Sequence, residues 1–292
     1  METKTLLLAL GANFFFAFGS QFFTYFSRKL GSVWMNAFKA SIAFICFTTW
    51  LVVNSQMRWI GVEMSYPLII SGFIGLGVGD VLLLLSFKEM GAGKTLMLFA
   101  FQPIIMGLAG YFLFDQQLDS ERLWAIIFFV LCLVIFSIES FKDHGHWGTR
   151  GLIFAVLGIL LDATGVIVTR YMFDGDQSLS PLLVNFYRTF GALVFFGLYQ
   201  FFKPIHLVQK FKSLSTADRS GAILGAFLGT FVSLSLFLAA LQYAHLASLS
   251  GIAITGAIFS SILECLWQRK RPSKYLLLAF LFFLFGMWIL LF

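Results

Sequence analysis

The sequence predicts an all-α integral membrane protein with ten transmembrane helices, arranged as two inverted repeats of five helices. Three observations lead to this fold class. Long apolar segments fill the chain of 292 residues, the same order of motifs occurs twice, and each copy holds an odd number of apolar segments. An odd number of crossings makes the second copy enter the bilayer from the opposite side. Inverted repeats of this kind are typical of secondary transporters.

The composition places the protein in a bilayer. Hydrophobic residues make up 59% of the chain and charged residues only 12%, whereas a soluble domain carries about 25% charged residues. A spanning helix needs about 20 apolar residues to cross a hydrocarbon core of about 30 Å. Ten such helices with short loops use nearly the whole length and leave no room for a soluble domain. The net charge of +6 is scattered over short loops, which argues against a nucleic-acid partner.

The repeats are expected at residues 1–139 and 150–292. Matched motifs follow one another at nearly equal offsets in the two copies. The matched motifs are Gly19 and Gly165, Tyr25 and Tyr171, Asn36-Ala-Phe-Lys39 and Asn185-Phe-Tyr-Arg188, and Phe73-x-Gly75 and Phe227-x-Gly229.

The helices follow from the apolar segments and the turn residues between them. The first repeat is expected to form helices at 4–26, 32–53, 67–87, 91–113 and 121–139, and the second at 150–172, 181–202, 219–241, 246–267 and 273–291. The start of the chain lacks the basic region and cleavage site of a signal peptide, so the first segment is expected to stay as a helix. Charged, glycine and proline residues separate the helices, and the longest loops, near 54–66 and 203–217, occupy matching positions.

The distribution of basic residues predicts the orientation. The face that joins helices 1–2, 3–4, 5–6, 7–8 and 9–10, called the basic face below, carries Arg28, Lys29, Lys88, Lys94, Lys142, Arg150, Lys203, Lys210, Lys212, Arg219, Arg269, Lys270, Arg271 and Lys274. The opposite face, called the terminal face because it holds both chain ends, carries only Lys4, Arg58, Arg122 and Arg170. Because basic loops stay in the cytoplasm, both termini are expected outside.

One stretch of sequence resembles a known family. It runs from Gly75 through Leu-Ser86-Phe-Lys-Glu-Met-Gly91-Ala and Phe-Gln102-Pro103-Ile-Ile to Phe114-Asp-Gln-Gln-Leu118. The pattern is similar to that of the ten-helix EamA-like exporters of the drug/metabolite transporter superfamily. The resemblance implies alternating access through a cavity between helices 1–4 and 6–9, with helices 5 and 10 peripheral. It also implies cytoplasmic termini, against the charge count.

The chain departs from the family pattern at three places. Phe18-Gly19 replaces the Trp-Gly of helix 1, Gln102 replaces an acidic residue before Pro103, and Gly256-Ala257 replaces the proline of the second half. Helix 1 also lacks the membrane-embedded glutamate of the related small multidrug resistance proteins, so drug/proton exchange by that route is not expected.

Four ionisable residues lie deep within the expected helices: Lys39, Asp80, Asp162 and Arg188. Charges at such depth are costly and by default mark functional sites. Their depths permit two ion pairs, Lys39–Asp80 and Arg188–Asp162. These pairs either brace helix packing, or bind a charged or zwitterionic solute, or supply an aspartate that accepts a proton. Asp162 lies nearest the midplane and is the favoured proton acceptor.

Four uncharged polar residues complete the expected substrate site: Asn36, Gln102, Asn185 and Thr255. Each can bond a solute in an otherwise apolar cavity, or it can bond a neighbouring helix instead.

Enzymatic and metal chemistry find no support in the residues. Cys46, Cys132 and Cys265 fall in or at the end of apolar segments without metal-ligand spacing. His144 and His146 lack further ligands, and no nucleophile–base arrangement stands out. We therefore expect no catalytic residues, no metal and no cofactor.

The function predicted is that of a secondary transporter, an exporter of small organic metabolites such as amino acids or their derivatives, with proton coupling open. The alternatives are a polytopic membrane enzyme or lipid-handling protein, and a non-transporting membrane scaffold. The expected partners are a small-molecule solute and the lipid bilayer, without nucleic acid. The expected setting is the bacterial inner membrane, where the chain forms a monomer or a weak homodimer.

Overall fold

The structure is a computed structural model that describes residues 3–116, 149–267 and 274–291, with parts of 120–138 between them. Every regular element in these ranges is a helix. The first half holds α1 (Thr3–Leu30), α2 (Ser32–Val53), α3 (Val62–Ser71), the π-helical segment η1 (Gly72–Gly79), α4 (Asp80–Met90), α5 (Ala92–Leu98), the 3-10 turn η2 (Phe99–Phe101) and α6 (Gln102–Phe114).

The second half repeats this order. It holds α8 (Thr149–Gly175), α9 (Pro181–Phe202), α10 (Leu207–Lys212), α11 (Thr216–Ala226), the π-helical segment η3 (Phe227–Val232), α12 (Ser233–Leu241), α13 (Leu246–Ile252), α14 (Ile254–Trp267) and α15 (Lys274–Leu291). In both halves the third helix runs without a break through its π-helical segment, and the fourth helix is interrupted.

Six helices in the described part of the chain are long and apolar enough to cross a membrane: Thr3–Leu30, Ser32–Val53, Val62–Met90, Thr149–Gly175, Pro181–Phe202 and Thr216–Leu241. They match six of the ten predicted spans. The predicted fifth helix, 121–139, lies only in part within the described residues, and His144 and His146 lie outside them. The total of ten spans therefore stays a prediction.

Local chemistry accounts for several helix ends. Gly31 and Gly91 connect consecutive helices as single residues with φ of +100° and +88°, a backbone conformation that glycine adopts without steric cost. Ser180 caps α9 by accepting a hydrogen bond from the Leu183 amide, and Pro181 fills the first helical position.

Helix ends differ from the prediction by a few residues, and two places differ in a way that affects packing. The third helix begins at Val62, not at 67, and Pro67 lies inside it. Its ring costs one helical hydrogen bond, yet α3 continues through it because it packs against both α8 and α9. The segment expected as a loop at 203–217 contains the short helix α10.

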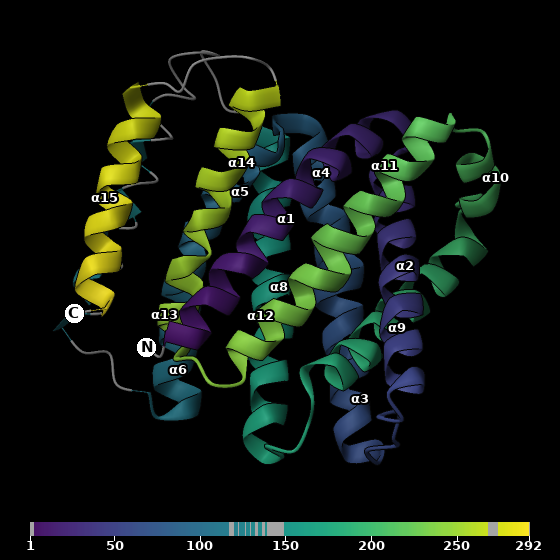
Figure 1. The fold of residues 1–292 in the computed structure, drawn as a ribbon, viewed down its shortest axis with the longest axis horizontal. Helices are drawn as coiled ribbons and strands as arrows, with labels where there is room; N and C mark the ends of the chain where they lie inside the picture. Colours follow the sequence, from purple (N-terminus) through teal and green to yellow (C-terminus); the bar gives the residue numbers. More distant parts are fainter. Residues whose placement is uncertain are drawn as a thin grey trace.

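The first helices of the two halves run in opposite directions. The Arg28 Nε at the end of α1 donates to the Lys88 carbonyl at the end of α4, over 3.1 Å. A Cβ on Gly151, at the start of α8, would lie 2.5 Å from Met90 Cγ. The end of α1 and the start of α8 therefore share one face, the relation expected of inverted halves. The start of α1 and the end of α15 lie together on the opposite side of the molecule (Figure 1).

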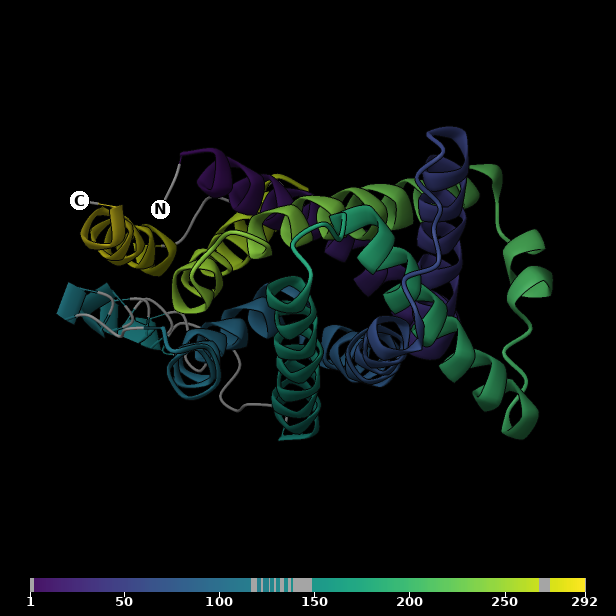
Figure 2. The same cartoon turned by 90° about the horizontal axis from the view of Figure 1, so that it is seen from below.

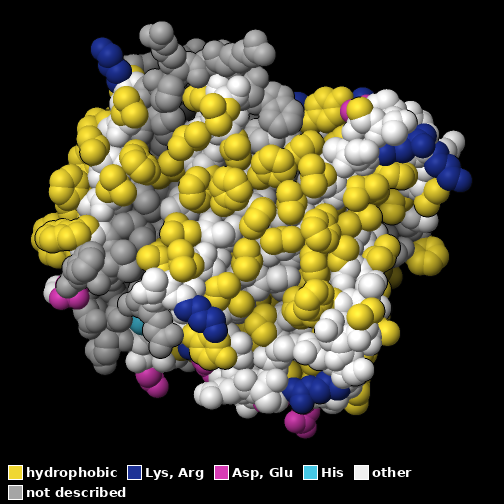
Figure 3. Space-filling model, viewed as in Figure 1, with side chains coloured by type: hydrophobic (Ala, Val, Ile, Leu, Met, Phe, Trp, Pro, Cys, Tyr) yellow, Lys and Arg dark blue, Asp and Glu magenta, His cyan; other side chains and the backbone are white. Residues whose placement is uncertain are grey.

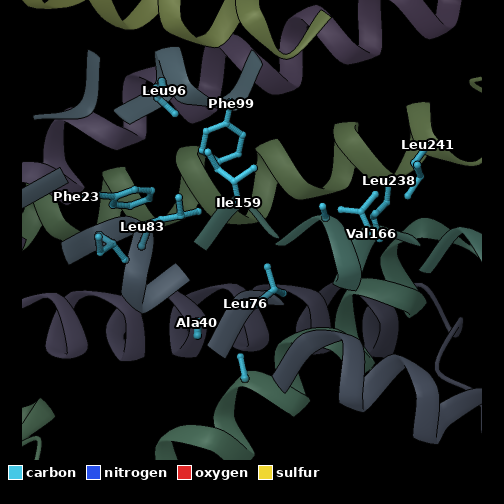
Figure 4. Packing of buried hydrophobic residues seen from close by; sticks show 14 of the residues in the cluster. Phe23, Ala40, Leu76, Leu83, Leu96, Phe99, Ile159, Val166, Leu238 and Leu241 are labelled. Atoms are coloured by element: carbon cyan, nitrogen blue, oxygen red, sulfur yellow. The ribbon is translucent and has the colours of Figure 1, made fainter. Parts of the chain in front are cut away.

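The first helix of each half packs mainly against helices of the other half. Helix α1 packs along α11, η3, α12 and α14, while α8 packs along α3, η1, α4 and α6. Helices α2 and α9 contact each other between these groups. In Figure 2, α1 (purple) overlaps the α11–α12 helix (green), against which it packs. The buried side chains form one cluster across the halves, in which Leu83 of α4 lies near Ile159 of α8 (Figure 4).

The outer surface suits lipid. Hydrophobic side chains cover the middle of the face shown in Figure 3, and charged side chains gather toward its upper and lower parts. Phe201 and Phe202 are 87% and 90% exposed, and side chains this apolar are stable on a surface that contacts hydrocarbon or its interface.

Candidate functional site

The centre of the molecule contains a buried ion pair. Lys39 of α2 bonds to Asp80, the first residue of α4, through its ammonium group. The two residues are 4% and 7% exposed. The Lys39 ammonium also lies 5.2 Å from the centre of the Phe23 ring of α1, where the negative face of the ring adds a favourable contact. The Lys39–Asp80 pair, which the depths of the two residues permit, is therefore formed.

Asn36, one turn before Lys39 on α2, attaches this helix to the π-helical segment η1. Its amide Nδ2 donates to the Leu76 and Gly77 carbonyls over 2.9 and 3.0 Å. The widened turn of a π-helix leaves carbonyls open to such partners. The Asn36 Oδ1 is buried and has no hydrogen-bond partner.

A small cavity adjoins the ion pair, with room for about one water molecule. Both halves line it, and the Thr230 hydroxyl of η3 is a second buried group without a partner. The lining residues are Asn36, Lys39, Ala40, Leu76, Asp80, Thr189 and Thr230.

The matched residues of the second half are arranged differently. Asn185 repeats the role of Asn36, since its Nδ2 donates to the Leu234 carbonyl of α12 over 2.9 Å. Arg188, which matches Lys39, is 1% exposed and donates through Nε to Ser71 Oγ of α3 over 3.1 Å. Its Nη1 is buried without a hydrogen-bond partner.

The permitted Arg188–Asp162 ion pair is not formed. Asp162 of α8 is partly exposed and accepts a hydrogen bond from Gln102 Nε2 of α6 over 3.1 Å. Ser71 meanwhile holds the Arg188 Nε and donates to the Gly165 carbonyl over 2.7 Å. A neutral neighbour thus holds each charge in place. The two charges still interact electrostatically across the gap.

Gln102 and Thr255 occupy matching places in the interrupted fourth helices. Gln102 begins α6 directly after η2, and Thr255 follows the break between α13 and α14. The Thr255 hydroxyl donates to the Ile252 carbonyl of its own turn over 2.7 Å, and Asn13 of α1 donates to that carbonyl over 3.1 Å. Thr255 is therefore not among the residues that line the cavity.

Three hydroxyl residues belong to this centre but were not predicted: Ser71, Thr189 and Thr230. Hydroxyls are common in membrane helices and cost little there, so the sequence offers no signal that separates these three from others. The predicted Asn36, Lys39 and Asp80 do line the cavity. Asp162 and Gln102 form a neighbouring contact on the α6–α8 side.

Polar contacts join the helix ends on both faces. On the basic face, Lys29 of α1 forms an exposed ion pair of 2.7 Å with Asp218 of α11. On the terminal face, Arg170 donates to the Leu241 and Ala244 carbonyls over 2.8 and 2.7 Å.

The terminal-face loops are joined through Ser178. Arg58 bonds the Ser178 carbonyl and hydroxyl over 3.0 and 2.9 Å. Hydrogen bonds from the Ser178 side chain and amide hold the pKa of Asp176 below its usual value.

Inverted helical halves around a buried polar centre define a polytopic transporter. The chain belongs to the EamA-like transporter family of the drug/metabolite transporter superfamily, since residues 3–138 and 149–292 match that family. Members of this family are membrane transporters of small molecules and not enzymes, so this protein is a multi-pass membrane transporter.

Solved structures share the fold. One, titled "Crystal structure of protein", superposes with a TM-score of 0.77 at 11% identity and covers 100% of this chain and 97% of its own. It is one of 28 solved chains that match. No curated protein matches the sequence.

Proposed function

We propose that the protein is a secondary transporter that moves small organic solutes by alternating access through the centre between its two halves. One observation carries this proposal. The cavity beside the Lys39–Asp80 pair is lined by α2, η1 and α4 of the first half and by α9 and η3 of the second. A movement of one half against the other changes the exposure of this cavity, as alternating access requires.

We further propose that the sequence repeats, 1–139 and 150–292, exchange their first helices to build the moving parts. The α1–η3 contact and the α8–η1 contact each join helices from different repeats. Close glycine contacts support sliding at both places: a Cβ on Gly19 would lie 2.4 Å from Gly229 Cα, and one on Gly165 would lie 3.4 Å from Gly75 Cα. Backbones that meet without side chains can shift with little steric cost.

The finer assignment is export of amino acids or their derivatives, with a proton as the coupling ion. Charges of both signs near the centre, Lys39 with Asp80 and Arg188 with Asp162, suit a zwitterionic solute. The proposed site comprises Asn36, Lys39, Asp80, Gln102, Asp162, Asn185, Arg188 and Thr255, with Asp162 as the proton acceptor. We propose a bacterial inner-membrane protein that works as a monomer or a weak homodimer.

Reconstitution tests the proposal. Purified protein is first screened for thermal stabilisation by amino acids, nucleobases and quaternary amines. The stabilising solutes are then assayed for counterflow into proteoliposomes loaded with the unlabelled solute. We expect labelled solute to accumulate transiently, as a carrier requires. Stabilising solutes that never cross the bilayer would identify a non-transporting protein and contradict the proposal. Efflux from cells that express the protein would establish export.

A further inference from the structure

Each half carries a basic residue at the same position, but only the basic residue of the first half forms an ion pair with a carboxylate. Lys39 is paired with Asp80. Matching Gly75 with Gly229 places Leu234 where the first half has Asp80. Arg188 therefore has no carboxylate at the corresponding place in its own half. The two basic residues occupy matching positions in the repeats but have different neighbours.

No carboxylate elsewhere in the described residues forms an ion pair with Arg188. Asp80 is held by Lys39, and Asp162 is held by the Gln102 amide. The one side-chain partner recorded for the guanidinium is the neutral Ser71 hydroxyl. A guanidinium stays charged under all physiological conditions, and burying it without a carboxylate in direct contact is costly.

The free donor of Arg188 points to a specific kind of ligand. Nη1 is buried without a partner, and the neighbouring Nη2 is close to the space beside Gly75, where an added Cβ would lie 3.7 Å from it. A planar guanidinium presents paired N–H groups that match the two oxygens of a carboxylate. Gly75 brings no side chain against Nη2, although Gly165 and Leu161 pack close to the same place.

We propose that Arg188 binds an anionic group of the transported solute, a carboxylate or a comparable oxyanion. This inference rests on the proposed transport function and names the chemical class that the site selects. Lys39 does not perform this role, because Asp80 already neutralises it. The solute's anion supplies the charge that Leu234 does not, and Ser71 keeps the guanidinium in position through Nε.

Matched pairs of small molecules test the charge preference. The probes are acetate with acetamide, benzoate with benzamide, and 3-phenylpropionate with its amide, because each pair differs mainly in charge. Binding is measured by the thermal stabilisation of protein in lipid nanodiscs at constant ionic strength. For the wild type we expect at least one carboxylate to bind about tenfold to a hundredfold more tightly than its amide, the range expected of a charge-assisted hydrogen bond. Equal binding within every pair would overturn the proposal.

Variants then assign the preference to Arg188. In R188Q the preference should vanish, and in R188K it should fall but persist, because the charge remains while the planar fork is lost. R58Q, which removes an arginine from the terminal-face loop, should keep the full preference. A folded R188Q that still prefers carboxylates would overturn the proposal, and the wild-type measurement stands if R188Q does not fold.

Counterflow separates this inference from the proposed function. If R188Q still exchanges an uncharged solute across proteoliposomes, transport stands and Arg188 acts in selection. If the wild type prefers carboxylates but transports nothing, the anion site stands and the transport proposal fails.

Discussion

The backbone of η1 touches the backbone of α9 where Gly72 meets Arg188. A Cβ built on Gly72 would lie 1.8 Å from the Arg188 carbonyl oxygen. The neighbouring contact is as close, since a Cβ on Gly191 would lie 2.0 Å from the Ile69 carbonyl oxygen. This close packing of main chains positions the Arg188 side chain at the centre.

We expect Gly72→Ala to destabilise the protein strongly and Gly75→Ala to be tolerated. The first methyl group would overlap main-chain atoms that cannot move aside. The second would lie at ordinary contact distance, at least 3.6 Å from its neighbours. Thermal unfolding in nanodiscs measures the difference, and equal melting temperatures would contradict the packing at Gly72.

Breaking the Lys39–Asp80 pair on one side should cost more than removing both charges. Lys39→Met or Asp80→Leu alone leaves a buried charge without a partner, which typically costs about 3–5 kcal/mol. The double variant leaves an apolar pair and should be close to wild type. Unfolding free energies of the three variants check this. A double variant as unstable as the singles would contradict it.

Asp162→Asn should stay folded but lose transport driven by a pH gradient. The Gln102 amide can donate to Asn as it does to Asp162, so the helix contact survives, whereas the titratable group is gone. Solute counterflow, which needs no proton, should continue. Asp176→Asn, in the loop between α8 and α9, is the control. Wild-type pH dependence in Asp162→Asn would exclude Asp162 as the proton acceptor.

The Lys29–Asp218 pair should contribute little to stability and should weaken in salt. The Lys29 side chain is 41% exposed, and exposed ion pairs contribute little because water and salt screen them. A double-mutant cycle with alanine should give a small coupling energy at low salt. At about 1 M salt the Debye screening length is roughly 3 Å, so the coupling energy should fall. A large coupling energy that does not change with salt concentration would contradict this prediction.

Labelling tests the orientation predicted from the basic residues. In a background without native cysteines, Arg58→Cys on the terminal face should react with a membrane-impermeant maleimide in intact cells. Lys29→Cys on the basic face should react only after the cells are opened. The reverse pattern would place both termini in the cytoplasm, as the family resemblance implies.

The sequence predicts the helices and their pairing better than it predicts side-chain partners. Apolar segments located six spans, and the depths of Lys39 and Asp80 permitted their pairing, because depth is read directly from a straight helix. Contacts across the bundle also depend on the rotation of each helix. The π-helical segments η1 and η3 change that rotation, and no residue pattern predicted these segments. Ser71 holds the Arg188 guanidinium, and the Arg188–Asp162 pair that depth alone permitted is not formed.

The exchange of first helices has a consequence for biogenesis. Helix α1 leaves the ribosome before the other described helices, yet its hydrogen bonds reach far along the chain, from Ala12 to Ser233 and from Asn13 to Ile252. Until those later residues are inserted, the polar and glycine-rich side of α1 has only lipid or the insertion machinery against it. The first half should therefore be a substrate for membrane quality control when synthesis stops early. Completion of the second half should end that vulnerability, since it supplies the surface that α1 lacks.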